Sequence, residues 1–160
     1  MLLLYSELWL KRMRMVGSEM LKQALAHYGK NKMKNESFLR TLHQAVGIKY
    51  VYTNNWCGMF MAHVAQQAGY EVPEHAEVAR KWLKVGTAVV TPETGDLVIS
   101  WRVAKQAWQG HVGIYIGPTS NDRLFILGGN QGVNKSVCIW PYRLDHVLGY
   151  RRLGYTGVSC

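Results

Sequence analysis

The first half of the chain carries apolar residues at the three- and four-residue spacing of amphipathic helices. The segments SEMLKQALAHYG (residues 18–29) and ESFLRTLHQAVG (residues 36–47) each end on a glycine, which commonly terminates a helix. After Cys57 the same spacing continues as far as Gly69. These patterns predict three helices, and EHAEVARKWLKVG (residues 74–86) predicts a further short one.

The second half changes to the two-residue alternation of β-strands. Five short runs are separated by turn residues: GDLVISW, HVGIYIG, RLFILGG, SVCIWP and HVLGYRR. Helices followed by strands predict an α+β fold, with N-terminal helices packed on a C-terminal antiparallel sheet of about five strands. We expect one domain over residues 18–155, an N-terminal extension over residues 1–17 and a tail over residues 156–160.

Composition narrows the class of protein and of partner. The 160 residues, 48% of them hydrophobic, suffice for one globular domain with a buried core. The formal net charge of +9 favours polyanionic partners such as nucleic acid, anionic lipid or the bacterial cell wall, although it also fits a merely solubilising surface. The basic residues are dispersed without interleaved aromatics, which argues against a specific nucleic-acid site.

Targeting signals are not evident. The apolar start contains Glu7, and its positive charges follow the apolar stretch, which is the reverse of a secretory signal. No uncharged run approaches the roughly 18 residues that span a bilayer, so we expect no integral membrane segment. The three cysteines, an odd number, lack the spacing of a metal knuckle or a disulfide scaffold, and we expect no metal.

Cys57 directly follows Trp56 and opens a predicted helix, an unusual place for a cysteine whose role is packing. Free cysteines are most often buried packing residues. A cysteine at a helix N-terminus, however, feels the partial positive charge and free N–H groups there, which lower the thiol pKa. Cys57 is therefore a candidate nucleophile. Trp56 either belongs to the core or lines a substrate groove.

Among six histidines, His111 is the candidate base because it opens a predicted strand. Strand alternation places it on one face with Gly113, and the low surface at this glycine would let the helix start approach. Thiol catalysis also needs a group that orients the base. Asn130 and Gln131 end the next strand, and antiparallel pairing could bring a side-chain carbonyl there to the other ring N–H of His111.

Five segments, in this order along the chain, resemble the NlpC-type cell-wall cysteine hydrolases, a family close to the CHAP amidases. They are NNWCGMFMAHVAQQAGYEVP, GDLVISWR, GHVGIYIG, LGGNQG and LGYRR. The similarity extends from about residue 20 to residue 153, and the combination is more specific than any single segment.

The resemblance implies a papain-like fold in which Cys57 is the nucleophile, His111 the base and Asn130 the third, orienting residue, with Gln131 as its rival. It implies cleavage of an amide bond in peptidoglycan, either within the stem peptide or at its link to the sugar, without a metal or organic cofactor. For the oxyanion, Tyr52 is a candidate beside the Cys57 backbone N–H. Tyr50 is an equal alternative, and both tyrosines could instead be core residues.

The expected partner is bacterial peptidoglycan, and an immunity or delivery protein is conceivable. We expect a monomer that is made in the cytoplasm and acts at the cell wall or periplasm after release or secretion, as a phage lysin or an antibacterial effector would. Two alternatives belong to other classes. One is a wall-binding or phage structural module without turnover, and the other is a nucleic-acid-binding domain driven by charge.

Overall fold

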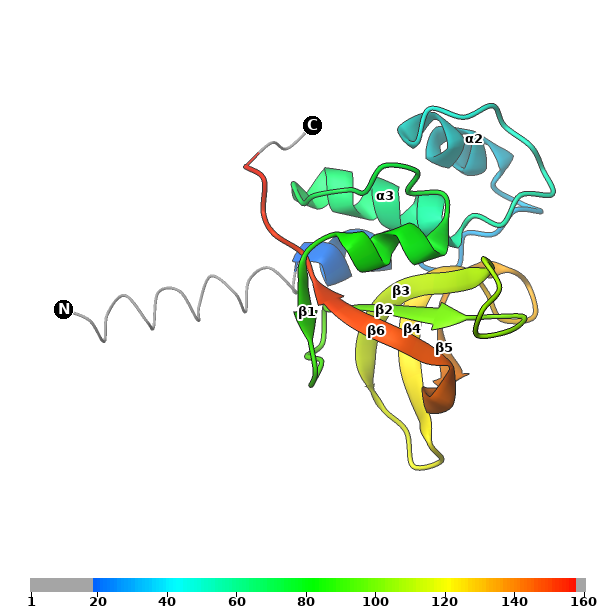
Figure 1. Ribbon diagram of the computed structural model, residues 1–160. Coiled ribbons are helices and arrows are strands. Elements are labelled where there is room, and N and C mark those ends of the chain that lie inside the picture. The colour runs from blue at the N-terminus through cyan, green and yellow to red at the C-terminus, as the bar shows by residue number, and fades with distance from the viewer. Residues whose placement is uncertain (1–18, 158–160) are drawn as a thin grey trace.

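An antiparallel sheet of six strands forms the second half of the protein in this computed structural model, which describes residues 19–157. Its strands are β1 (Thr87–Val89), β2 (Leu97–Trp101), β3 (Gly110–Pro118), β4 (Arg123–Gln131), β5 (Ser136–Arg143) and β6 (Val147–Arg152). They lie in the order β1-β6-β2-β3-β4-β5, so that β2 and β3 are central. Figure 1 shows the longer helices gathered on one side of this sheet.

The helical elements come mostly before the sheet. They are a helix over residues 19–25, α2 (Glu36–Ala45), α3 (Cys57–Ala68) and the 3-10 helices η1 (Ala79–Lys84) and η2 (Leu144–His146). Helix α3 lies between α2 and strands β3 and β4, which is why most of its residues are apolar and buried. It ends at Gly69, whose φ of 77° is the left-handed conformation that closes many helices.

The two faces of the sheet carry separate apolar clusters. Val112 and Ile114 of β3 belong to the large core beneath α3. Tyr115, which lies between Ile114 and Ile116 in the sequence, packs on the opposite face against a small cluster built around Val98 and Ile126. The alternation expected for β3 is therefore present, and it assigns His111 to the face opposite the large core.

A partly buried ion pair joins the neighbouring strands β2 and β6. The Arg152 guanidinium donates two hydrogen bonds of 2.7 Å to the carboxylate of Asp96, which lies just before β2. Both bonds are charge-assisted and together form the bidentate geometry that suits arginine and carboxylate. The Asp96 side chain is thus committed to holding β6 beside β2.

The expected α+β class is confirmed, with two corrections. The sheet has six strands where about five were expected, because the three-residue β1 is too short to show a period. The helix expected over residues 74–86 is only the 3-10 turn Ala79–Lys84. His75 has a φ of 57°, a left-handed value that a right-handed helix cannot contain. The proposed extension over residues 1–17 lies outside the described residues.

Candidate functional site

Cys57 is the first residue of α3, and its side chain is 3% exposed. Burial raises the pKa of the Cys57 thiol. The backbone N–H groups of Val112, Gly58 and Cys57 itself and the positive charge of Arg102 act in the opposite direction but do not cancel the effect of burial. The expectation of a lowered pKa is therefore wrong for the protein without ligand. Val112 directly follows His111, so the sulfur lies against the backbone that carries the candidate base.

His111 is the second residue of β3, is equally buried, and is hydrogen-bonded to Gln131. The distance from His111 Nε2 to Gln131 Oε1 is 2.7 Å. The amide nitrogen of Gln131 donates to the carbonyl oxygens of Ile126 and Cys138. Because both amide hydrogens are used, the Gln131 oxygen must accept, and His111 Nε2 must carry the proton. The neutral imidazole then has a free lone pair at Nδ1, as a base requires.

Burial also sets the charge of this pair. It lowers the pKa of His111 to about 4, and the positive charges of Arg102 and Lys135 act in the same direction. The hydrogen bond to Gln131 opposes the shift but does not cancel it. Near neutral pH the resting site therefore contains a neutral imidazole and a protonated thiol. It is not a preformed thiolate–imidazolium pair.

Asn130 does not lie beside His111, contrary to the first choice from the sequence. The β4–β5 pairing shifts register between Gly128 and Gln131, and Asn130 has a φ of 60°. Such a bulge inserts one residue into a strand and reverses the face of those that follow. Gln131 therefore points to the His111 face, while Asn130 Nδ2 donates to Asn55 Oδ1 at 3.1 Å. Asn130 helps attach β4 to the loop before α3.

Two adjacent glycines in β4 make room for the side chains around the site. A Cβ on Gly128 would lie 2.7 Å from Gln131 Oε1, and one on Gly129 would lie 2.5 Å from the Trp56 ring. Gly128 thus leaves space for the amide that holds His111. Gly129 leaves space for the indole next to Cys57.

A side chain at position 113 is excluded by a different neighbour from the one expected. A Cβ there would lie 2.3 Å from Cγ2 of Ile126, a member of the small cluster on the His111 face. The glycine therefore accommodates a neighbouring strand's side chain, and its role in admitting the helix start is not supported by these contacts.

The expected aromatic positions separate into core and surface. Trp56 is fully buried and packs edge-on against Phe60, so it belongs to the core and does not line a groove. The Tyr52 ring is exposed and lies under the Lys32 ammonium group, 4.5 Å from it. The buried Tyr50 hydroxyl has no hydrogen-bond partner among residues 19–157, and the Arg40 guanidinium covers its ring. Within residues 19–157 no hydrogen bond joins either tyrosine to Cys57, although Tyr50 packs against the core cluster that contains Cys57.

Two residues of the site were not expected from the sequence. Tyr142 of β5 stacks on the His111 ring, with ring centroids 4.7 Å apart and planes inclined by 11°. Arg102, just after β2, is exposed and acts electrostatically on Cys57, His111 and Tyr142. Arg102 lies two residues beyond Ser100, which pairs directly with His111. The sequence shows that Arg102 follows Ser100 by two residues, but it does not show that Ser100 pairs with His111. Nothing in the sequence indicates that Tyr142 contacts His111.

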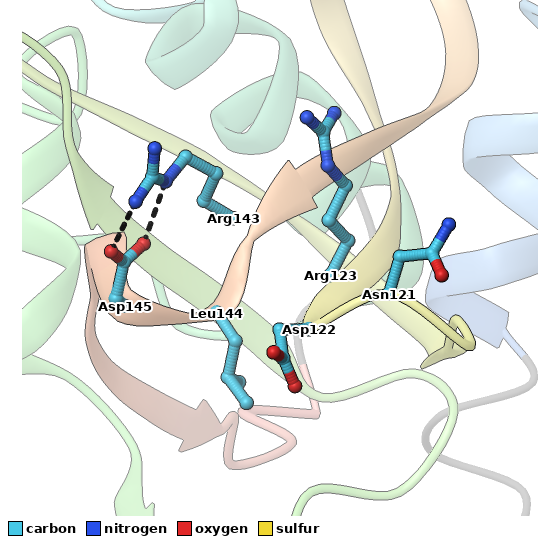
Figure 2. Close-up of a pocket in the computed structure, with 6 residues that line it drawn as sticks. All are labelled: Asn121, Asp122, Arg123, Arg143, Leu144 and Asp145. Carbon is cyan, nitrogen blue, oxygen red and sulfur yellow. Dashed lines mark hydrogen bonds and ion pairs between the residues drawn. The ribbon is translucent and has the colours of Figure 1, made fainter.

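A surface hollow of about 490 Å³ lies elsewhere on the sheet. Figure 2 shows its lining, in which Arg143 is paired with Asp145, while the side chains of Arg123 and Asp122 extend away from each other. It is formed by the β3–β4 turn and η2, and none of its lining residues belongs to the Cys57 site. Its lining contains two arginines and two aspartates, so the formal charges of these side chains cancel.

Within residues 19–157 no cluster of three or more histidine, cysteine or acidic side chains is arranged to hold a metal ion. The same part of the chain contains no helix with the length and apolar character needed to cross a bilayer. Comparison of the chain with protein-family models, curated proteins and solved structures finds no significant match. The functional argument therefore rests on the residues of this chain.

Proposed function

We propose that the protein is a cysteine hydrolase that cleaves an amide bond in peptidoglycan peptides. The observation that carries the proposal is the His111–Gln131 hydrogen bond, whose direction puts the proton on Nε2 and leaves the lone pair of His111 Nδ1 available as a base. Cys57 is the nucleophile, His111 is the acid and base, and Gln131 positions the imidazole in place of Asn130. The resemblance to NlpC-type and CHAP enzymes supplies the substrate class.

In the proposed reaction, Nδ1 of His111 takes the thiol proton of Cys57 as the sulfur attacks the amide carbonyl carbon. The N–H groups at the start of α3, including that of Cys57, would stabilise the oxyanion in this reaction. His111 returns the proton to the leaving amine, and the acyl group stays on sulfur as a thioester. Water, deprotonated by His111, then releases the acid and restores the thiol.

In the resting protein the Cys57 thiol, whose pKa is raised by burial, is a weak nucleophile until a base removes its proton. The proposed reaction therefore requires substrate binding to bring the pKa values of the thiol and of His111 closer together.

The test is digestion of purified peptidoglycan, with the products identified by mass spectrometry. Wild type should release soluble fragments with new termini, and Cys57→Ala and Cys57→Ser should not. Cys138→Ala is the matched control, because Cys138 is the other described free cysteine, and it should retain activity. Equal digestion by wild type and Cys57→Ala would refute the mechanism.

A wall-binding module without turnover is the second candidate. It is favoured by the near-complete burial of Cys57 and His111, which restricts access of a substrate carbonyl to the sulfur. This candidate predicts that the protein sediments with purified peptidoglycan of several chemotypes while releasing no fragments from any of them.

A further inference from the structure

Arg102 and Lys135 place two positive charges beside the buried Cys57 and His111. Both cations act on His111, and Arg102 acts on Cys57 as well. Neither has a carboxylate partner within residues 19–157, although other arginines such as Arg143 and Arg152 are paired with aspartates. A guanidinium left unpaired at the edge of a reactive site is available to a ligand.

Strand geometry brings each cation to the site. Ser100 lies opposite His111 in the β2–β3 pairing, and Arg102 follows two residues later, directly after the last residue of β2. Lys135 precedes Ser136, which pairs with Gln131, the residue that holds His111. The two cations therefore come from different connections, one after β2 and the other in the turn between β4 and β5.

The loop that begins at Arg102 is held in place by Arg80 of η1. The Arg80 guanidinium donates to the carbonyl oxygens of Ala104, Lys105 and Gln109. Because these bonds hold both the middle and the end of the loop, the loop loses little further conformational entropy when a ligand binds. The same loop exposes the apolar side chains of Val103 and Trp108, each 70% accessible.

We propose that this rim, defined as Arg102, Val103, Trp108 and Lys135, binds the substrate through a free carboxylate next to the scissile amide. Arg102 forms the principal contact because a guanidinium binds a carboxylate through two parallel hydrogen bonds. Lys135 adds a second charge, and the apolar side chains cover the aliphatic part of the peptide. The inference rests on the proposed function for the location of the scissile bond, and it names a substrate class: peptides with an unamidated acidic residue at that bond.

The probes are two synthetic peptidoglycan stem peptides that differ only in whether their side carboxylates are free or converted to primary amides. Binding is measured by calorimetry in the Cys57→Ala background, with Arg102 intact or changed to Gln, and turnover is measured with otherwise wild-type protein. Lys105→Gln is the matched control, because it removes one positive charge from the same loop, and no electrostatic effect of Lys105 on Cys57 or His111 is found.

With Arg102 intact, the free-carboxylate peptide should bind about 10-fold or more tightly than the amidated one, the range of a charge-assisted hydrogen bond. Arg102→Gln should remove most of that preference, Lys135→Gln should reduce it by a smaller factor, and Lys105→Gln should preserve it. Equal binding of both peptides, or a preference that survives Arg102→Gln, would overturn the inference.

Binding and turnover separate the two proposals. A carboxylate preference that depends on Arg102, without any cleavage by wild type, would support the binding site and remove the hydrolase. Cleavage that depends on Cys57 but ignores amidation would support the hydrolase and remove the carboxylate site.

Discussion

Three hydrogen bonds hold the Gln131 side chain in one orientation. Two backbone carbonyls, of Ile126 and Cys138, take its amide hydrogens, and His111 Nε2 must then donate to its oxygen. Gln131 therefore determines which nitrogen of His111 carries the proton as well as where the ring lies. The Tyr142 ring, stacked on the face of the imidazole, restricts its rotation further.

Gln131→Leu is expected to lower kcat/KM for peptidoglycan peptides by about 10- to 100-fold, because it removes a buried hydrogen bond worth roughly 1.5–3 kcal/mol to a charged imidazolium. Asn130→Ala is the matched control in the adjacent position and should change kcat/KM by less than about 3-fold. Steady-state kinetics on both variants, with folding checked by circular dichroism, make the measurement.

A positioning role also predicts a conservative rescue. Gln131→Glu keeps an acceptor for His111 Nε2 and adds a negative charge that raises the His111 pKa, so the acid limb of its pH–rate profile should move to higher pH. A larger loss of activity for Asn130→Ala than for Gln131→Leu would show that the role of the two residues has been assigned wrongly.

The buried His111 should make the folded state sensitive to acid. Its folded pKa of about 4 lies below the ordinary value of 6.5, so between these pH values the unfolded chain binds more protons. Stability is then fully present above about pH 6.5 and declines as the pH falls toward 4, by up to about 3 kcal/mol from this one group. His27, whose pKa burial also lowers to about 4, contributes with the same sign.

Urea denaturation at a series of pH values between 7 and 4 tests this expectation. Wild type should lose stability across the interval, and His111→Gln should lose less, because the titrating group is gone. The slope of stability against pH is the readout, so a uniformly destabilised variant remains informative. Identical slopes for the two proteins would mean that His111 is not buried in its neutral form.

At the scale of elements, the site depends on an irregularity in β4. The helix opening at Cys57, the strand opening at His111 and the order of both along the chain follow from apolar spacing, which sequence shows directly. The bulge at Asn130 does not follow from spacing, because strict alternation continues Ile126 and Gly128 to Asn130 and so selects the wrong amide. The stacked Tyr142 comes from a distant strand, and its contact depends on how the whole sheet curves.

The paired glycines in β4 supply a stability test at this scale. Gly129→Ala should cost about 1–3 kcal/mol of unfolding free energy, because its Cβ would overlap the Trp56 ring, which is enclosed in the core. Gly117→Ala in β3 is the matched control: nothing lies within 4 Å of its Cβ position, and alanine is favoured over glycine in a strand. Chemical denaturation of both variants gives the comparison, and equal costs would contradict the close packing of Trp56.

At the scale of the whole molecule, the formal charge of +9 acts at longer range than the rim around Cys57. Dispersed surface charges attract an anionic polymer before any specific contact forms, and this attraction speeds association. The carboxylate contact of Arg102 instead operates at hydrogen-bonding distance beside buried groups, where salt screens less. The two contributions should therefore be separable by ionic strength.

Sedimentation of the Cys57→Ala variant with purified peptidoglycan, at about 0.05 M and 0.5 M sodium chloride, distinguishes them. Binding should weaken at the higher salt concentration, because the screening length falls from roughly 14 Å to about 4 Å. The attraction between the anionic wall and most of the 19 basic side chains is then screened. Arg102→Gln removes only one of those charges and should leave the salt dependence nearly unchanged, while it removes most of the discrimination between free and amidated stem peptides. If binding were instead unaffected by salt, the overall charge would not drive wall association, and the exposed apolar side chains Val103 and Trp108 would be the surface to substitute next.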